Sequence, residues 1–298
     1  EPAARRILND KIDILVDLAG HTANNRLDVF ARRPAPIQVT YLGYPNSTGL
    51  PTMDYRITDA HADPEGLTDE DYTEKLVRLP RVFLAFSHPH EAPEVGALPA
   101  SRGEPLTFGS FNAIHKLSDF VLELWARVLC AVPDSRLLLK TKAFADEGVA
   151  DRFRGKLEAL GVAPERVTLL GFEKERSHHL AIYNRVDIAL DTFPYHGTTT
   201  TCEAMYMGVP VITLAGETHA SRVGASLMNA VGLPELVADS PEAFVRIAER
   251  LAADREALEN MRQGLRQRMA DSPLMDGAGL ARAMEAAYRE MWRKACAG

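Results

Sequence analysis

Short apolar runs alternate with helix-like segments along the whole chain. In the last two thirds of the sequence six such runs follow one another, at 106–111, 136–140, 167–172, 186–190, 209–214 and 235–238. Between the runs, apolar residues recur at helical spacing, for example at Phe120, Leu124 and Val128. Strands separated by helices in this way predict a parallel sheet that is buried on both faces and connected by right-handed crossovers. Six strands make a complete Rossmann-like domain.

The first third of the chain has fewer strand-like runs, at 12–18, 37–42 and 55–58. It therefore predicts an incomplete lobe of three or four strands. A stretch rich in Pro, Ala, Glu and Gly, at 90–105, indicates a linker. We expect an α/β protein with a partial Rossmann-like lobe at 1–95 and a complete one, with a six-stranded parallel sheet, at 96–298.

The two ends of the chain carry helical patterns. The last helix has one apolar face, formed by Met284, Ala287, Tyr288 and Met291. We expect this face to pack back across the first lobe. Residues 1–10 resemble the end of a helix and position 1 is not Met, so we expect a fragment of a longer chain.

Composition argues against several classes of function. The chain has 298 residues, 46% of them apolar, which is enough for two lobes with ordinary cores. A net charge of −7 and the lack of a long run of Lys and Arg argue against a nucleic-acid partner. The apolar runs are far shorter than the ~20 residues of a membrane-spanning helix, and no signal peptide is visible. Cys130, Cys202 and Cys296 are widely spaced, so we expect no disulfide framework and a cytoplasmic location.

The most informative segment is 195–210, which reads YHGTTTTCEAMYMGVP and follows a strand-like run. A helix N-terminus after a parallel strand leaves backbone N–H groups without partners and favours an anion. Gly197 permits close approach of a ligand, and the hydroxyl groups of residues 198–201 suit phosphate oxygens. Glu203 lies one turn further on, where a carboxylate accepts hydrogen bonds from a ribose diol. The alternative is that the threonines only cap a core helix.

Several motifs occur together in one order. They are 34–38 (PAPIQ), 42–45 (LGYP), 111–112 (FN) ahead of Lys116, the threonine run with Glu203, 216–218 (GET) and 220–223 (ASRV). This series resembles the catalytic region of the O-GlcNAc transferase family and its relatives, the plant SPINDLY O-fucosyltransferase and the bacterial soluble N-glucosyltransferases. The resemblance implies a glycosyltransferase of the two-lobed GT-B fold, which inverts the anomeric centre without a metal or other cofactor. Its partners would be a nucleotide sugar in the second lobe and a protein or peptide acceptor between the lobes.

The resemblance also implies roles for single residues of the second lobe. Lys116 would contact the diphosphate and stabilise the departing nucleotide in place of a metal cation. His179 would lie over the base, and Arg176 would approach its edge. The alternative for each of the three is an ordinary solvated side chain. The rest of the expected nucleotide-sugar site consists of Asn112, His196, Gly197, Thr198, Thr199, Thr200 and Glu203.

In the first lobe, the resemblance places Leu42, Gly43 and Pro45 against the sugar ring. A tight turn after a strand describes the same backbone and does not compete with that role. His21 follows a predicted strand at its carboxyl end. It is a candidate to act on the acceptor hydroxyl, and the alternative is a hydrogen bond to the backbone.

Two segments resemble metal sites only superficially. Asp69, Glu70 and Asp71 match the D-x-D pattern that holds a divalent ion in other glycosyltransferases. They lie far from the donor motifs, and we expect a solvated acidic turn. His88 and His90 lack a third ligand nearby, so we expect no metal there either.

Three hypotheses for function remain open. The first is transfer of GlcNAc from UDP-GlcNAc to Ser or Thr hydroxyl groups of proteins, and the second is the same scaffold with GDP-fucose or UDP-glucose as donor. The third is a catalytically silent fragment that binds nucleotides or partners. The run His196-Gly197-Thr198 is closer to SPINDLY and bacterial forms than to the animal enzymes, which have histidine in place of Thr198. Relatives also carry more of the acceptor lobe, and usually tetratricopeptide repeats, upstream of the equivalent of Glu1.

Overall fold

The computed structural model of the protein describes residues 2–297. Its larger sheet has six parallel strands in the order β10-β9-β8-β5-β6-β7. The strands are β5 (Thr107–Ser110), β6 (Arg136–Lys140), β7 (Val167–Leu170), β8 (Ile188–Leu190), β9 (Val211–Leu214) and β10 (Val237–Ala238). The prediction of an α/β lobe with a six-stranded parallel sheet is therefore confirmed. Since β8 pairs with β5, the strand order reverses between these two strands, as it does in a Rossmann fold.

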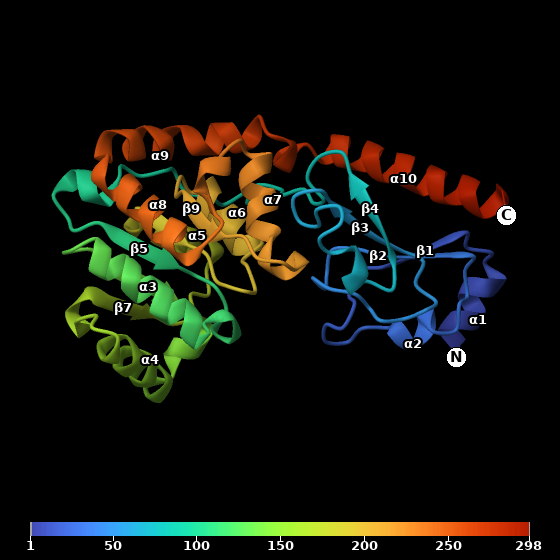
Figure 1. The fold of residues 1–298 in the computed structure, drawn as a ribbon, viewed down its shortest axis with the longest axis horizontal. Helices are drawn as coiled ribbons and strands as arrows, with labels where there is room; N and C mark the ends of the chain where they lie inside the picture. The colour runs from blue at the N-terminus through green and yellow to red at the C-terminus, as the bar shows by residue number, and fades with distance from the viewer. Residues whose placement is uncertain (1, 298) are drawn as a thin grey trace.

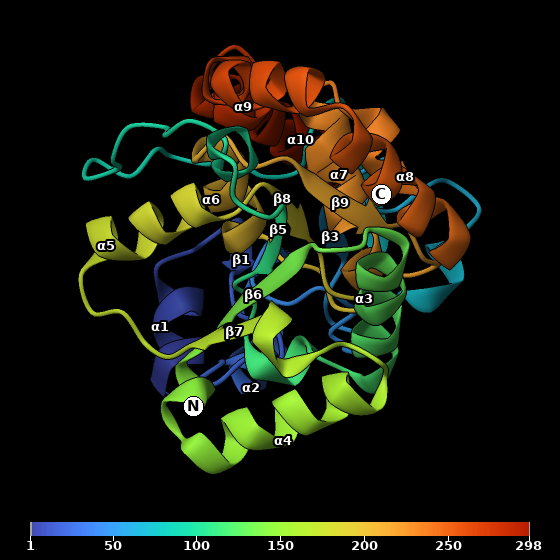
Figure 2. The same ribbon diagram turned by 90° about the vertical axis from the view of Figure 1, so that its left-hand side faces the viewer.

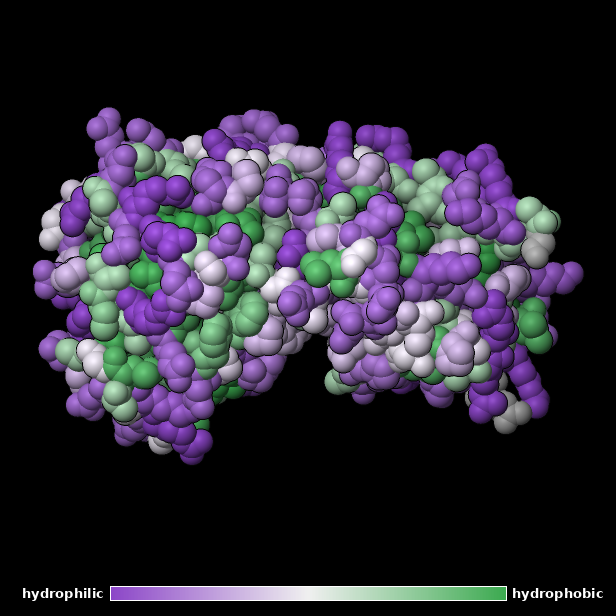
Figure 3. Space-filling model, viewed as in Figure 1, coloured by the Kyte–Doolittle hydropathy of each residue, from purple (hydrophilic) through white to green (hydrophobic). Residues whose placement is uncertain are grey.

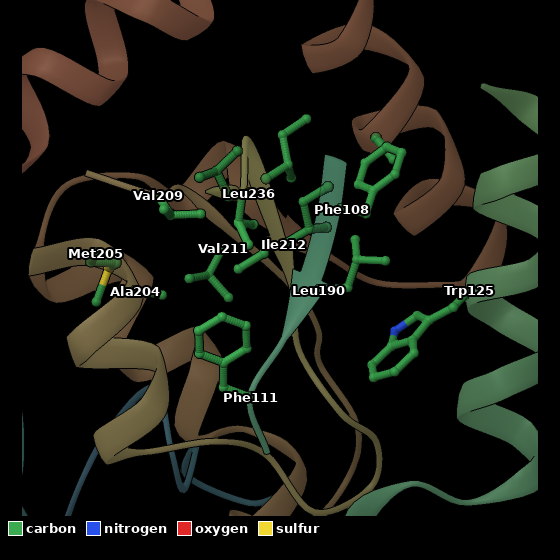
Figure 4. Packing of buried hydrophobic residues seen from close by; sticks show 14 of the residues in the cluster. Phe108, Phe111, Trp125, Leu190, Ala204, Met205, Val209, Val211, Ile212 and Leu236 are labelled. Carbon is green, nitrogen blue, oxygen red and sulfur yellow. The ribbon is translucent and has the colours of Figure 1, made fainter. Parts of the chain in front are cut away.

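Helices cover both faces of this sheet. They are α3 (Asp119–Ala131), α4 (Glu147–Ala159), α5 (Arg176–Ala181), α6 (Thr199–Tyr206), α7 (Val223–Ala230), α8 (Pro241–Ala253) and α9 (Arg255–Ala270). Figure 2 shows α5 and α6 on one side of the sheet and α3 on the other. In the core, Trp125 of α3 and Met205 of α6 approach the strands from opposite sides, around Phe108 and Ile212 (Figure 4). These four side chains are fully buried, because strands covered on both faces have no solvent side.

The smaller sheet has four parallel strands in chain order, β1 (Ile14–Asp17), β2 (Ile37–Thr40), β3 (Tyr55–Asp59) and β4 (Lys75–Leu79). Two short helices belong to this lobe, α1 (Pro2–Asn9) and α2 (Leu27–Phe30). The sequence pattern did not reveal β4, because Lys75 and Arg78 interrupt its apolar residues. In the larger lobe, the run at 167–172 ends as a strand at Leu170, and Phe172 is exposed.

The last helix, α10 (Gly277–Ala297), leaves the second lobe and lies along the first. Its apolar face packs on a core cluster that contains Ile37, Val39, Ile57 and Leu79. On the helix side Met291 is buried, and Met284, Ala287 and Tyr288 pack around it. The helix therefore covers one face of the smaller sheet.

The two lobes lie side by side, with α10 above the first lobe in the view of Figure 1. The space-filling view shows a notch in the outline between the lobes, on the lower side of the molecule (Figure 3). Among residues 2–297, no helix has the length and apolar character that crossing a membrane requires.

Candidate functional site

The reversal of strand order between β5 and β8 brings two predicted motifs together. Asn112 and Lys116 follow the carboxyl end of β5, and the threonine turn at 197–201 follows β8. Crevices at such a reversal are where open α/β sheets bind ligands, because the connections on either side lead in opposite directions. A pocket at this edge is lined by Ser110, Asn112, Asp191 and Thr200 among others.

The turn before α6 is held from below by buried polar groups. One carboxylate oxygen of Asp191 accepts a hydrogen bond from the Gly197 backbone N–H at 2.8 Å. The His196 ring is fully buried, where its Nε2 lies 2.9 Å from the Leu214 carbonyl. A side chain at position 197 would not fit, since a Cβ atom there would lie 2.6 Å from Oγ1 of Thr200. The ring of His196 therefore lies beneath the turn, and the contact of this residue with a nucleotide sugar stays a prediction.

Four consecutive backbone N–H groups open the helix. Those of Thr198, Thr199, Thr200 and Thr201 have no hydrogen-bond acceptor in the described part of the chain. The Thr200 hydroxyl donates to Oδ1 of Asn112 at 2.8 Å, which ties the turn to the loop after β5. Unpaired N–H groups at a helix N-terminus attract an anion, and the helix dipole adds to this attraction. The turn can accordingly bind a phosphate.

Lys116 supplies a positive charge next to this turn. Its Nζ donates a hydrogen bond to the His196 carbonyl at 2.6 Å and lies 3.8 Å from the centre of the Tyr195 ring. Burial lowers the pKa of Lys116 below its ordinary value, although the Asp191 carboxylate acts in the opposite direction. The carbonyl and the ring together fix the ammonium beside the unpaired N–H groups of the turn.

A second cluster forms where α5 meets α6. Nζ of Lys140 lies 2.9 Å from Nδ1 of His179, and Nε2 of His179 lies 3.2 Å from Oε2 of Glu203. Because the Lys140 ammonium can only donate, Nδ1 of His179 accepts its hydrogen bond. The ring proton is then on Nε2, which donates a hydrogen bond to Glu203. Arg176 approaches the other oxygen of Glu203 at 3.8 Å, and its side chain is 56% exposed. Burial lowers the pKa of Lys140, while Glu173 and Glu203 oppose that effect.

The predicted residues of the first lobe lie in loops after β1 and β2. His21 is exposed, and its Nε2 lies 2.8 Å from the Thr48 carbonyl, so Nε2 carries a proton and Nδ1 is free to accept one. Leu42 is 48% exposed at a φ of 67°, a backbone conformation that is costly for a leucine. Gly43 is required by space, because a Cβ there would lie 2.0 Å from the Leu18 carbonyl oxygen. Pro45 is half-buried. No hydrogen bond within residues 2–297 joins these loops to the threonine turn.

The segments that superficially resemble metal sites have other partners. Asp69 lies in an exposed turn and forms an ion pair with Arg78, which donates to both carboxylate oxygens at 2.8 Å. The rings of His88 and His90 pack edge to face, with 5.3 Å between their centres. Within residues 2–297 no group of three His, Cys, Asp or Glu side chains could hold a metal ion.

Known proteins resemble this chain along nearly its whole length. The model of glycosyl transferase family 41 matches residues 1–96 and 98–284. The chain belongs to glycosyl transferase family 41. A Petunia hybrida protein named probable UDP-N-acetylglucosamine--peptide N-acetylglucosaminyltransferase SPINDLY is 51% identical over 292 residues, which are 98% of this chain and 31% of the relative. An Arabidopsis thaliana protein with the same enzyme name and the suffix SEC is 33% identical over 309 residues, covering 99% of this chain and 31% of the relative. The family-41 chain thus spans about a third of the length of these curated relatives.

Solved structures share the arrangement of the two lobes. A mutant of the Thermobaculum terrenum O-GlcNAc transferase superposes with a TM-score of 0.92 at 42% identity, over 99% of this chain and 56% of that chain. A UDP complex of the Anabaena protein HepE has a TM-score of 0.60 at 12% identity, over 97% of this chain and 82% of that chain, and shows likeness of fold alone. The family-41 chain therefore has the GT-B fold, as predicted.

Three residues of the candidate site were missed by sequence reasoning. Lys140 is the last residue of β6, and a charged residue at the carboxyl end of an apolar strand next to β5 was a signal that could have revealed it. Asp191 follows β8 in the same way. Tyr195 precedes the threonine turn, and only the fold shows that its ring meets Lys116.

Proposed function

We propose that this chain is the catalytic region of a transferase that moves GlcNAc from UDP-GlcNAc to Ser and Thr hydroxyl groups of proteins. In this proposal the anomeric centre is inverted and no metal ion takes part. Support comes from the names of the relatives, which are peptide N-acetylglucosaminyltransferases, and from the resemblance to an O-GlcNAc transferase structure. The observation that carries the proposal is the row of unpaired N–H groups at Thr198–Thr201 beside the ammonium of Lys116.

The donor has a natural orientation in this site. Its diphosphate accepts hydrogen bonds from the N–H groups of the threonine turn and faces Lys116. Glu203, one helical turn further on, receives the ribose hydroxyl groups. The base lies near His179, whose half-buried ring is held by Lys140 and Glu203. The sugar then points toward the first lobe, where Leu42 and Gly43 form the facing wall.

The reaction consists of one displacement. The acceptor oxygen attacks the anomeric carbon from the face opposite the diphosphate, and the bond between that carbon and the phosphate oxygen breaks. The electron pair of that bond leaves with UDP, so negative charge grows on the β-phosphate. Lys116 and the helix N-terminus are already oriented toward this charge, which is the arrangement that lowers a barrier most effectively. Lys116 would do here what a divalent cation does in other enzymes.

The hydroxyl proton needs an acceptor on the first lobe. His21 is a candidate because its Nε2–H bonds the Thr48 carbonyl and leaves the Nδ1 lone pair available. A neutral imidazole of this kind accepts the proton as the acceptor oxygen forms its bond to the sugar. In the second lobe, His196 has no such role, since it is fully buried.

Transfer assays on the complete gene product test this function. UDP-GlcNAc, UDP-glucose and GDP-fucose are supplied in turn with a protein acceptor, and the sugar added to Ser or Thr is detected by mass spectrometry. We expect transfer from UDP-GlcNAc, and a loss of about 100-fold or more in kcat for Lys116→Ala with an unchanged circular-dichroism spectrum. Transfer only from GDP-fucose or UDP-glucose would show that UDP-GlcNAc is not the donor. Undiminished activity of Lys116→Ala would refute the role of this lysine.

A further inference from the structure

A buried side-chain pair joins the two lobes, and the reaction as described does not use it. Asp63 follows β3 in the first lobe, and His219 begins the short helix η7 (His219–Ser221) of the second lobe, 156 residues later. Nδ1 of His219 lies 2.6 Å from Oδ2 of Asp63. The aspartate is fully buried and the histidine is 3% exposed. We call this pair the lobe clasp.

Further side chains of the first lobe surround the clasp. Thr58 donates to Oδ2 of Asp63, and the Tyr72 hydroxyl donates to Oδ1 at 3.1 Å. The Phe83 ring packs edge to face on His219, with 5.0 Å between the ring centres. Burial raises the pKa of Asp63, but the hydrogen bonds from His219 and Thr58 outweigh this and lower it to about 2. Both oxygens of the buried Asp63 carboxylate accept hydrogen bonds, and a displacement of the lobes would leave this buried charge without its His219 donor.

A continuous series of contacts leads from the clasp to the donor site. His219 is followed by Ala220, whose backbone carbonyl accepts a hydrogen bond from the His196 N–H at 3.0 Å. The His196 carbonyl in turn accepts the 2.6 Å hydrogen bond from Lys116. The ammonium that faces the diphosphate is therefore two hydrogen bonds away from the segment that contacts the other lobe.

We propose that Asp63 and His219 are positioning residues, which hold the acceptor lobe in register with Lys116 and the threonine turn. This inference rests on the proposed function, because register between the lobes matters only where an acceptor and a donor meet. Displacements of about 1 Å at reacting groups can cost on the order of 100-fold in rate. The clasp should therefore affect the rate of transfer more than the affinity for the nucleotide, which the second lobe binds by itself.

The chain offers a matched control at the same interface. Arg81 and Asp276 form an exposed ion pair at 3.0 Å, which links the segment after β4 in the first lobe to the residue before α10. No hydrogen bond within residues 2–297 connects this pair to His196 or Lys116. Exposed ion pairs contribute little to stability. Arg81→Gln should thus leave both the register of the lobes and the rate unchanged.

Kinetics and binding on the complete gene product test the inference. For His219→Leu we expect kcat to fall by about 10- to 100-fold while the dissociation constant of UDP changes by less than about 3-fold. His219→Asn retains a donor close to the position of Nδ1 and should recover most of the lost rate. If His219→Leu does not fold, Asp63→Asn takes its place, because it keeps the shape of the side chain and removes the charge. A folded variant of either kind with the kcat of wild type would overturn the proposal, as would a parallel fall in kcat and UDP affinity.

Small-angle X-ray scattering separates a failure of this inference from a failure of the proposed function. If the wild-type protein transfers no sugar, the proposed function fails. Whether the clasp holds the two lobes together is then decided by the radius of gyration alone. We then expect His219→Leu or Asp63→Asn to give a larger radius of gyration than wild type and Arg81→Gln. Identical scattering profiles for all four proteins would show that the pair does not hold the lobes.

Discussion

The ammonium of Lys116 lies 3.8 Å from the centre of the Tyr195 ring, beside the proposed donor site. The ring is 39% exposed, so it is not a core side chain that meets the lysine by chance of packing. A cation above an aromatic face is held by the ring's quadrupole, and this adds direction to the hydrogen bond that Lys116 makes. The two residues follow different strands, β5 and β8, and meet at the reversal of strand order.

Removal of this ring should weaken transfer without abolishing it. A cation–π contact at a partly exposed site contributes about 1 kcal/mol, which corresponds to about 5-fold in rate. We expect Tyr195→Leu to lower kcat by about this factor and Tyr195→Phe to remain within about 2-fold of wild type, because phenylalanine retains the ring. Steady-state kinetics at saturating donor measure both. Equal losses in the two variants would point to the hydroxyl group instead.

Lys116 should also set the alkaline limit of activity. Burial lowers its pKa, so the ammonium that the diphosphate needs is lost as pH rises through a value below the ordinary ~10.5 of lysine. We expect kcat/KM, which reports the free enzyme, to fall on the alkaline side below that value. Lys116→Arg keeps its charge at high pH and should move the limit upward at a lower overall rate. An alkaline limit at the same pH in this variant would assign it to another group.

Glu203 should recognise the ribose through its two oxygens. It is only 7% exposed, and His179 and Arg176 orient it. We expect Glu203→Gln to weaken UDP binding by about 10-fold, since one acceptor and the charge are lost. Calorimetric titration with 2′,3′-dideoxy-UDP completes a double-mutant cycle, in which the variant and the wild type should bind this analogue equally. A full 10-fold loss for the analogue would place the effect outside the ribose.

Two buried histidines should make stability sensitive to mild acid. Burial is the main cause that lowers the pKa of both His196 and His219, so the folded protein holds these rings neutral. In the unfolded chain the same rings take up protons near pH 6.5. The free energy of unfolding is therefore unaffected by these rings above that pH. As the pH falls below 6.5, it decreases by at most ~1.4 kcal/mol per pH unit for each ring. Thermal midpoints at about pH 7.5 and 5.5 measure the loss, and His219→Asn should reduce it. The pKa of Asp63 is about 2, so the stability that its ionised form contributes is lost only at more acidic pH.

Much of the fold could be predicted because its strands are buried on both faces and therefore appear as apolar runs. The strand β4 was missed for the converse reason, since only its last residue, Leu79, is buried and two of its residues are charged. The unpaired N–H groups of the threonine turn, on which the predicted phosphate site rests, could be expected because backbone chemistry at a helix N-terminus depends little on distant residues.

Contacts between distant segments were beyond sequence reasoning. Lys140 and His179 are separated by 39 residues, and Asp63 and His219 by 156, so no local pattern relates their side chains. The burial of His196 was equally hidden, because its neighbours Gly197 and Thr198 suggest an open turn. Its ring is held below that turn by two distant backbone groups, because Nε2 donates to the Leu214 carbonyl and Nδ1 accepts from the Gly224 N–H.

The most direct test of the account is calorimetric titration of the protein with UDP and with uridine. If the threonine turn and Lys116 bind the diphosphate, UDP should bind with one site per chain and at least about 100-fold more tightly than uridine, and Lys116→Ala should reduce this ratio by about 10-fold or more. Equal affinities for UDP and uridine in the wild-type protein would contradict the central claim that a diphosphate binds at this turn.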